Sequence, residues 1–493
     1  MNRFIQGKVT VRRLAIITAV ILLIAVSWWR VFEARTGLVV RPMVEKGVPM
    51  RYIGPAGVQQ VPGVLIAHGF GTSQQIMLGF GYALAHSGYG VLLWYFAGHA
   101  ANPAKLDLGS AALQNDLDAA YRQLVSQPEM DADRVALLGH SMGGGAVLEA
   151  AVREPDRYRA TIAVSPVETE VSPDAPRNLL LLAGEWEPLF ADNAARVLAQ
   201  AGGESRAFDD GRARSLTIVP QVEHILILFS PTTHEAAVNW LDQVFSRESA
   251  SGYQDRRILW FGASLLGWML LIAAASPLIP APAAPLDERT RYPWRGLSFF
   301  LSPLAAAGAL ASFSRIIDVS RLGGLVVGGA LGLWFLLMGV TWLVTGFRPP
   351  RPARHDLWWG LSLFGFLWVA FGLLAQVVWF PWMLIPARLL RWPLMALAFL
   401  PWTLATGIIL QRASWRKRLG WWLGQSVWLT ASLILVVRLV PSLFVLVLVV
   451  PVLSLLFGIM FIAGSALDRP WSYGIGNALF FGWLVMAFFP IAS

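Results

Sequence analysis

The sequence contains no cysteine and little charge. None of its 493 residues is a cysteine, which excludes a disulfide framework and thiol chemistry. Only 14% of the residues are charged, whereas soluble domains contain about 25%. The shortage is greatest from residue 258 onwards, where long apolar runs dominate, while charges are frequent between residues 35 and 257. We therefore predict a water-soluble domain and a membrane domain.

Signatures of several other function classes are missing as well. The sequence has no G-x-x-x-x-G-K-[ST] motif for nucleotide hydrolysis, and its scattered histidines, without an H-E-x-x-H spacing, predict no metal site. The formal net charge is +9, but the arginines lie in short segments between apolar runs, as the positive-inside rule expects. We expect no nucleic-acid partner, no metal and no other cofactor.

Nine apolar stretches are long enough to span a bilayer. The first, residues 14–31, follows a basic N-terminus and ends in a poor A-x-A cleavage site, so we expect a retained anchor. Eight more lie near residues 258–279, 297–313, 322–346, 357–382, 393–411, 420–437, 439–466 and 471–490. Within the third of these, Gly324, Gly328 and Gly332 repeat every four residues, which predicts a helix face for close packing.

The basic residues of the short segments predict the orientation. The N-terminus, the segments 280–296, 347–356 and 411–419, and Arg469 together carry 15 Arg and Lys, against 5 in the alternate set. The first set should be cytoplasmic. This places the N-terminus inside and the soluble domain outside the cytoplasmic (inner) membrane, although Arg256 and Arg257 lie on the wrong side of their span.

The expected domains are an anchor (1–33), an extracytoplasmic domain (34–250) and a membrane domain of about eight helices (256–493). In the extracytoplasmic domain, strands are expected at residues 62–67, 89–94, 134–138, 160–164, 178–183 and 214–219. Helices are expected near residues 73–87, 110–127, 142–153, 189–202 and 231–246. This alternation predicts a mostly parallel α/β sheet, with ligands at the carboxyl ends of the strands.

One glycine-flanked serine lies at such a strand end. Residues 139–143 (GHSMG) fit G-x-S-x-G, a pattern that occurs by chance in roughly one such chain in four. Here it stands between a strand and a helix, the context of a nucleophile elbow that exposes Ser141. The backbone N–H groups of Phe70, in the turn after strand 62–67, and of Met142 could form an oxyanion hole.

A serine nucleophile needs a histidine base that a carboxylate orients. Among the histidines after Ser141, His355 falls in a predicted cytoplasmic loop, His224 follows strand 214–219, and His234 lies near a helix start. We favour His224 and expect His234 at the surface. Strand 178–183 ends in Gly184-Glu185-Trp186-Glu187, so both glutamates are candidates for the acid.

The soluble part resembles the α/β-hydrolase superfamily, in particular its dienelactone-hydrolase-like and serine-aminopeptidase-like branches. The resemblance covers about residues 35–247 and rests on the segments LIAHGFGTS, GYALAHSGYGVLLWYFAGHAAN, GHSMGG, AGEWE and EHILIL. It implies Ser141 as nucleophile, His224 as base and Glu187, three residues after the strand-end glycine, as acid. Members more often carry Asp at the acid position, which keeps Glu185 as the alternative.

The same resemblance limits what can be transferred. Relatives usually have Asp where Tyr95 stands and Gly where Ala100 stands, so their substrate preference does not carry over. Their pattern also makes His68, His99 and His140 structural turn residues. A cap often follows the strand after the nucleophile helix in this fold, but residues 167–177 are too few for a large one.

The resulting hypothesis is a membrane-embedded serine hydrolase with a Ser-His-Glu triad, acting on an acyl ester of a lipid or of another envelope component. An exopeptidase, an amidase or an acyltransferase with the same triad is the alternative. A non-catalytic transporter or scaffold with a hydrolase-like binding domain belongs to a different class.

Overall fold

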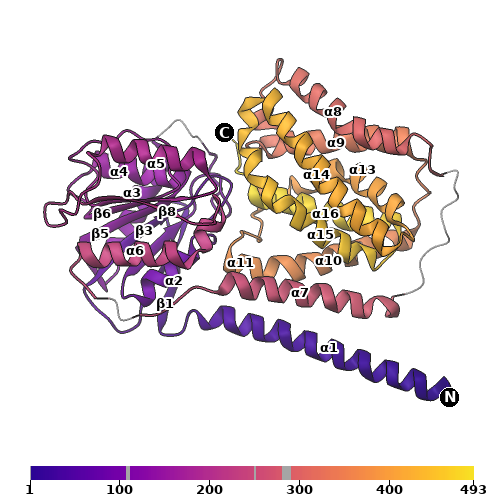
Figure 1. The fold of residues 1–493 in the computed structure, drawn as a ribbon, viewed down its shortest axis with the longest axis horizontal. Helices are drawn as coiled ribbons and strands as arrows, with labels where there is room; N and C mark the ends of the chain where they lie inside the picture. The colour runs from indigo at the N-terminus through magenta and orange to yellow at the C-terminus, as the bar shows by residue number, and fades with distance from the viewer. Residues whose placement is uncertain (1, 107–110, 249–250, 280–289, 493) are drawn as a thin grey trace. The chain divides into compact units, whose positions relative to one another are not determined.

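The chain folds into two compact units, one built on a β-sheet and one of helices (Figure 1). The computed structural model describes residues 2–106, 111–248, 251–279 and 290–492. The sheet unit comprises residues 29–261 and 375–383, and the helical unit residues 1–28, 262–374 and 384–492. The expected domain boundary at residue 250 and the loop 280–289 with Arg289 lie outside the described residues.

The sheet has eight strands in the order β1-β2-β4-β3-β5-β6-β7-β8. β2 runs antiparallel to β1 and to β4, and the other neighbours are parallel, as predicted. The strands are β1 (Leu38–Glu45), β2 (Val48–Pro55), β3 (Val61–Ala67), β4 (Gly90–Trp94), β5 (Met130–His140), β6 (Ala160–Val164), β7 (Leu179–Gly184) and β8 (Arg214–Val219).

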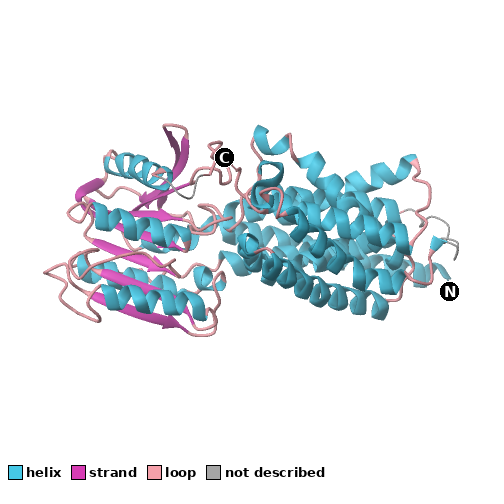
Figure 2. Ribbon diagram, turned by 90° about the horizontal axis from the view of Figure 1, so that it is seen from above, coloured by secondary structure: helices cyan, strands magenta, loops and turns pink. Residues whose placement is uncertain are grey.

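Helices cover both faces of this sheet (Figure 2), because alternate strand residues are apolar on both sides. In β3, Val64 and Ile66 pack in one core cluster with residues of α2 (Leu78–His86) and α6 (Pro231–Val244). Leu65 and Ala67 pack in another cluster with residues of α3 (Ala112–Val125) and α4 (Met142–Arg153). α5 (Pro188–Gln200) packs on β7 in a third cluster.

Nine helices of the described part of the chain are long and apolar enough to cross a membrane. They are α1 (Asn2–Glu33), α7 (Arg257–Ala275), α8 (Arg295–Phe313), α9 (Gly328–Gly346), α10 (Arg354–Leu367) continued by a π-helical segment and α11 (Leu374–Val378), α12 (Pro386–Leu389) with α13 (Trp392–Leu410), α14 (Trp415–Leu439), a 3-10 segment (Pro441–Val449) with α15 (Val450–Ser465), and α16 (Pro470–Phe488). Each corresponds to one of the nine predicted stretches.

The predicted glycine face is wrong in one position. Gly324 ends a 3-10 turn (Val319–Gly324) and has φ +74°, so α9 begins only at Gly328. A Cβ at Gly332 would lie 2.6 Å from the sulfur of Met395 in α13, which shows close helix packing at that position. The close packing therefore involves Gly328 and Gly332, which lie in α9, and does not extend to Gly324.

Candidate active site

The serine lies on a strained turn between β5, which ends at His140, and α4, which begins at Met142. Ser141 has φ 54° and ψ −118°, a backbone conformation that side-chain-bearing residues rarely adopt. The flanking glycines are sterically required. A Cβ at Gly139 would overlap the carbonyl oxygen of Gly143, and one at Gly143 would lie 2.5 Å from the carbonyl oxygen of His68.

The loop after β3 lies directly against this turn. A Cβ at Gly69 would be 3.2 Å from the Cβ of Ser141, so the N–H of the next residue, Phe70, belongs to the immediate surroundings of the serine. Neither this N–H nor that of Met142 donates a hydrogen bond to another described residue. Both remain available to an external acceptor, as an oxyanion hole requires.

Two buried histidines hold that loop in place. The N–H of Phe96 donates to Nε2 of His68 (3.1 Å), and the N–H of Gly71 donates to Nε2 of His99 (3.2 Å). Burial lowers the pKa of His68 to about 4, so its ring stays neutral and can accept this hydrogen bond. Their role in the structure is thus the expected one of turn residues.

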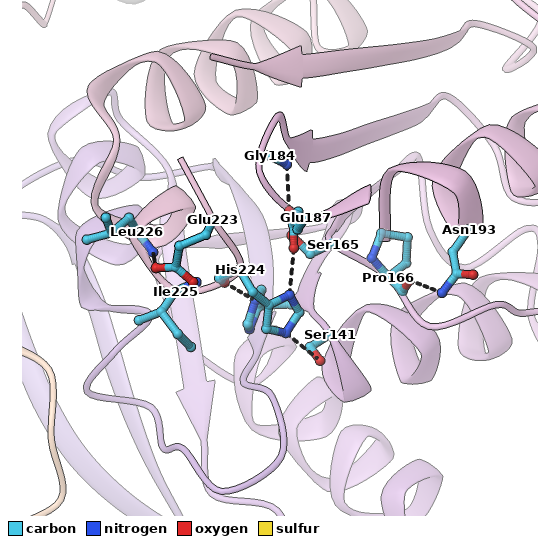
Figure 3. Close-up of polar contacts among 11 residues, drawn as sticks. Ser141, Ser165, Pro166, Gly184, Glu187, Asn193, Glu223, His224, Ile225 and Leu226 are labelled. Carbon is cyan, nitrogen blue, oxygen red and sulfur yellow. Dashed lines mark hydrogen bonds and ion pairs between the residues drawn. The ribbon is translucent and has the colours of Figure 1, made fainter. Parts of the chain in front are cut away.

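Ser141, His224 and Glu187 lie in one hydrogen-bonded row (Figure 3). Nε2 of His224 is 3.1 Å from Oγ of Ser141, and its Nδ1 is 2.7 Å from Oε2 of Glu187. All three residues are buried, with 5–7% of their surface exposed. The three residues come from the ends of β5 and β7 and from the loop after β8, the edge of the sheet where the sequence predicted the site.

Several residues that the sequence analysis did not identify surround this row. Oε1 of Glu187 accepts hydrogen bonds from Oγ of Ser165 and from the N–H of Gly184, both 2.5 Å long. The ring of Phe190 stacks on that of His224, with centroids 3.9 Å apart, and Nε2 of His140 donates to the carbonyl of His224 (3.0 Å). These contacts fix the carboxylate and the imidazole in one orientation. The position of Ser165 directly after strand β6 was the signal that could have revealed it.

The two alternative residues occupy different surroundings. Glu185 is exposed and accepts a hydrogen bond from the N–H of Gln221 (2.9 Å). His234 is only 4% exposed, which makes the predicted surface position wrong. It shares the buried face of α6 with Ala237 and Leu241, and its Nε2 donates to the carbonyl of Leu228 (2.9 Å). Burial lowers its pKa.

Among the described residues, no group of three or more His, Cys, Asp and Glu side chains could hold a metal ion. A buried hydroxyl next to an imidazole, with free N–H donors beside it, suits nucleophilic attack on a carbonyl carbon.

Part of the chain is similar to known proteins. Residues 60–207 match the family model described as serine aminopeptidase, S33. No curated protein matches the chain. Similar solved structures include a dienelactone hydrolase from Anabaena variabilis (19% identity, 43% of this chain and 98% of that one, TM-score 0.34), a membrane phospholipase A described as a bacterial virulence factor (16%, 50% and 99%, 0.35) and the esterase Est22 (16%, 47% and 91%, 0.34).

The family match spans β3 to α5 and includes Ser141 and Glu187. The parallel sheet with helices on both faces and the strained serine between β5 and α4 have the form that the family implies. The sheet unit therefore has the form of an α/β-hydrolase domain and is similar to the serine aminopeptidase, S33, family over residues 60–207, and the same chain contains a helical part with several long apolar helices.

Proposed function

We propose that this protein is a membrane-embedded esterase in which Ser141 is the nucleophile, His224 the general base and Glu187 the residue that orients the histidine. The observation that carries the proposal is the continuous hydrogen-bond row from Glu187 through His224 to Ser141. The order of nucleophile, acid and base along the chain is that of α/β-hydrolases.

The reaction follows from the positions of these groups. Nε2 of His224 takes the proton of the Ser141 hydroxyl while Oγ attacks the carbonyl carbon of the ester. The N–H groups of Phe70 and Met142 stabilise the oxyanion of the tetrahedral intermediate. When the intermediate collapses, the C–O bond to the alcohol breaks and His224 returns the proton to the leaving oxygen. Water, activated by His224, then hydrolyses the acyl-enzyme and restores the serine.

Exposed apolar side chains next to the site support a lipid or another acyl ester as the substrate. Val167, Trp186, Leu189 and Leu226 are 39–65% exposed, and each lies within two residues of Ser165, Glu187 or His224 in the sequence. The link between β6 and β7 contains no helix or strand, so no cap covers these side chains from that position. Contiguous exposed apolar surface commonly marks a ligand-binding area, and these side chains are the candidates for one.

A second candidate is an exopeptidase or amidase that uses the same three residues. The matched family is described as serine aminopeptidase, and amide hydrolysis needs the same acyl-enzyme chemistry. Parallel assays of ester and aminoacyl-amide panels distinguish the two by the ratio of their kcat/KM values.

The decisive test is covalent labelling. A fluorophosphonate probe should label the full-length protein and fail to label Ser141→Ala. Absence of labelling in the intact wild-type protein, together with no turnover of either panel, would reject the enzymatic proposal in favour of a non-catalytic binding domain. For the substrate class, Trp186→Ser and Leu226→Ser should lower kcat/KM for long-chain esters several-fold more than for acetates. Val44→Ser, an exposed valine on β1, is the matched control.

A further inference from the structure

The helical unit contains a groove between α8 and α14 that the hydrolase chemistry does not use. Its volume is about 550 Å³, within the size range of sites for small organic ligands, roughly 300–1,000 Å³. The aromatic rings of Phe299 on α8 and Trp421 on α14 form part of its wall and contact each other at 4.8 Å between centroids. The groove therefore has a largely apolar interior.

Glycines keep this groove open. Gly296, Gly420 and Gly424 line it, and a Cβ at any of them would have no heavy atom within 4 Å. Glycines at tight helix contacts behave differently, since a Cβ at Gly339 in α9 would lie 2.5 Å from the backbone nitrogen of Trp402 in α13. The small residues of the groove thus leave space for an occupant rather than bring two helices together.

Positive charge lies at one end of the groove. Arg295 and Lys417 line it, are exposed, and form no ion pair with a carboxylate of the described residues. Arg291 also lines it, with Nη2 donating to the carbonyl of Ile408 (2.7 Å). All three precede or begin an apolar helix, at the level where a helix leaves the hydrocarbon core for the headgroups.

We propose that this groove binds one anionic phospholipid of the bilayer. The lipid phosphate contacts Arg295 and Lys417, and an acyl chain lies along the ring of Phe299. A free anion would use only the charged end, and a hydrocarbon only the apolar wall.

Native mass spectrometry of the purified full-length protein tests this site. In mixed micelles with equal phosphatidylglycerol and phosphatidylcholine, the wild type should retain phosphatidylglycerol preferentially. The double variant Arg295→Ala/Lys417→Ala should reduce that retention about tenfold or more, since each basic side chain near an anionic lipid contributes a factor of roughly five. Gly424→Leu, which fills the groove, should abolish it.

Matched variants separate the groove from general effects. Arg416→Ala removes a neighbouring exposed charge that does not line the groove, and Gly308→Leu fills open space elsewhere on α8; both should retain the lipid as the wild type does. Ser141→Ala should retain it too, so the site stands or falls independently of the proposed enzymatic activity. Equal retention of both lipids, or retention unchanged in Gly424→Leu, would overturn the proposal. Displacement of the lipid by millimolar inorganic phosphate would instead assign the site to a free anion.

Discussion

His224 is the single residue whose replacement best separates chemistry from folding. Its ring joins Ser141 to Glu187, so His224→Ala should lower kcat by about 10⁴- to 10⁶-fold, close to the loss in Ser141→Ala. Steady-state assays on the best ester of a panel measure this loss. His234→Ala removes a buried ring from the core and should lower stability, while the folded fraction keeps the wild-type kcat. The opposite pattern would make His234 the base.

The two glutamates after β7 should differ in how much their replacement lowers kcat. Glu187 accepts from His224, Ser165 and Gly184, so Glu187→Gln places an amide where an acceptor is needed and should cost roughly 10³- to 10⁴-fold in kcat. Glu185→Gln changes an exposed side chain and should leave kcat within about twofold. Circular dichroism of both variants controls for folding. A severe Glu185→Gln and a mild Glu187→Gln would move the acid to Glu185.

At this scale, the residues and their places at strand ends predicted Ser141 and His224, the choice of Glu187 over Glu185 came from the family resemblance, and the surroundings of the three were not predicted. Ser141, His224 and Glu187 carry recognisable chemistry at strand ends, and local patterns locate strand ends well. Whether a histidine is buried depends on which helix face meets the sheet, and for α6 this face includes His234. The Ser165 contact depends on two strands being neighbours, which is a property of the assembled sheet.

Among the elements, the turn between β5 and α4 is the most sensitive to a single methyl group. A Cβ at Gly143 would approach the backbone oxygens of Ala67 and His68 at 2.5–2.7 Å, and a backbone cannot move away as a side chain can. Gly143→Ala should therefore lower Tm by several degrees, as overpacking of about 1–3 kcal/mol implies, and reduce probe labelling. In Gly145→Ala the nearest group is a methyl of the partly exposed Val167, so Tm should change little. Equal effects would contradict a backbone clash.

Strands and helices of the hydrolase domain were predictable where apolar residues dominate, and less so at the edge of the sheet. Four inner strands, β3, β4, β6 and β7, are buried along their whole length and read as apolar runs. The β1–β2 hairpin was missed. β1 is an edge strand interrupted by Arg41 and Pro42, and its turn relies on positive φ at Lys46 and Gly47, a signal that only the backbone reveals. Whether such an edge strand forms depends on its contacts in the folded sheet.

For the hydrolase domain as a whole, buried histidines predict loss of stability in mild acid. Burial lowers the pKa of His68, His140 and His234 below the unfolded value near 6.5. Between about pH 6.5 and pH 4 the unfolded chain therefore binds more protons, and each histidine lowers the free energy of unfolding by up to about 1.4 kcal/mol per pH unit as the pH falls. Burial raises the pKa of Asp116 to about 6, so this carboxyl raises the free energy of unfolding as the pH falls. It is a single group, whereas three histidines lower that free energy.

This pH effect can be measured through the active site. Samples heated at pH 7.5, 6.0 and 5.0 and returned to pH 7.5 should lose probe labelling at progressively lower temperatures. The same series on His234→Phe, which removes one of the three titrating rings, should show a shallower dependence on pH. A half-inactivation temperature that is constant or rises towards pH 5.0 would contradict the conclusion that the three histidines outweigh Asp116.

The orientation of the whole chain is the largest inference that rests on charge alone. Two arginines of the sequence, Arg256 and Arg257, oppose the predicted orientation because they lie on the extracytoplasmic side of their span. In the structure Arg257 is 3% exposed and forms two 2.7 Å hydrogen bonds with the carboxylate of Asp255, so this charge is neutralised within the sheet unit. A paired arginine should count little towards orientation, which is set by basic residues that face the cytoplasm. Without Arg257, less charge opposes the 15 Arg and Lys of the segments predicted to be cytoplasmic.

We therefore expect a reporter fused near Gly252 to be extracytoplasmic and one in the segment 411–419 to be cytoplasmic. Paired alkaline phosphatase and green fluorescent protein fusions measure this, because the first is active only outside and the second fluoresces only inside. Asp255→Asn frees the charge of Arg257 and is the sensitive variant. If pairing neutralises this arginine, the variant should lower the extracytoplasmic signal at Gly252, whereas Gln254→Ala, in the same linker, should not. Fluorescence from a fusion near Gly252 in the wild-type chain would place the hydrolase domain in the cytoplasm and reverse the expected substrate pool.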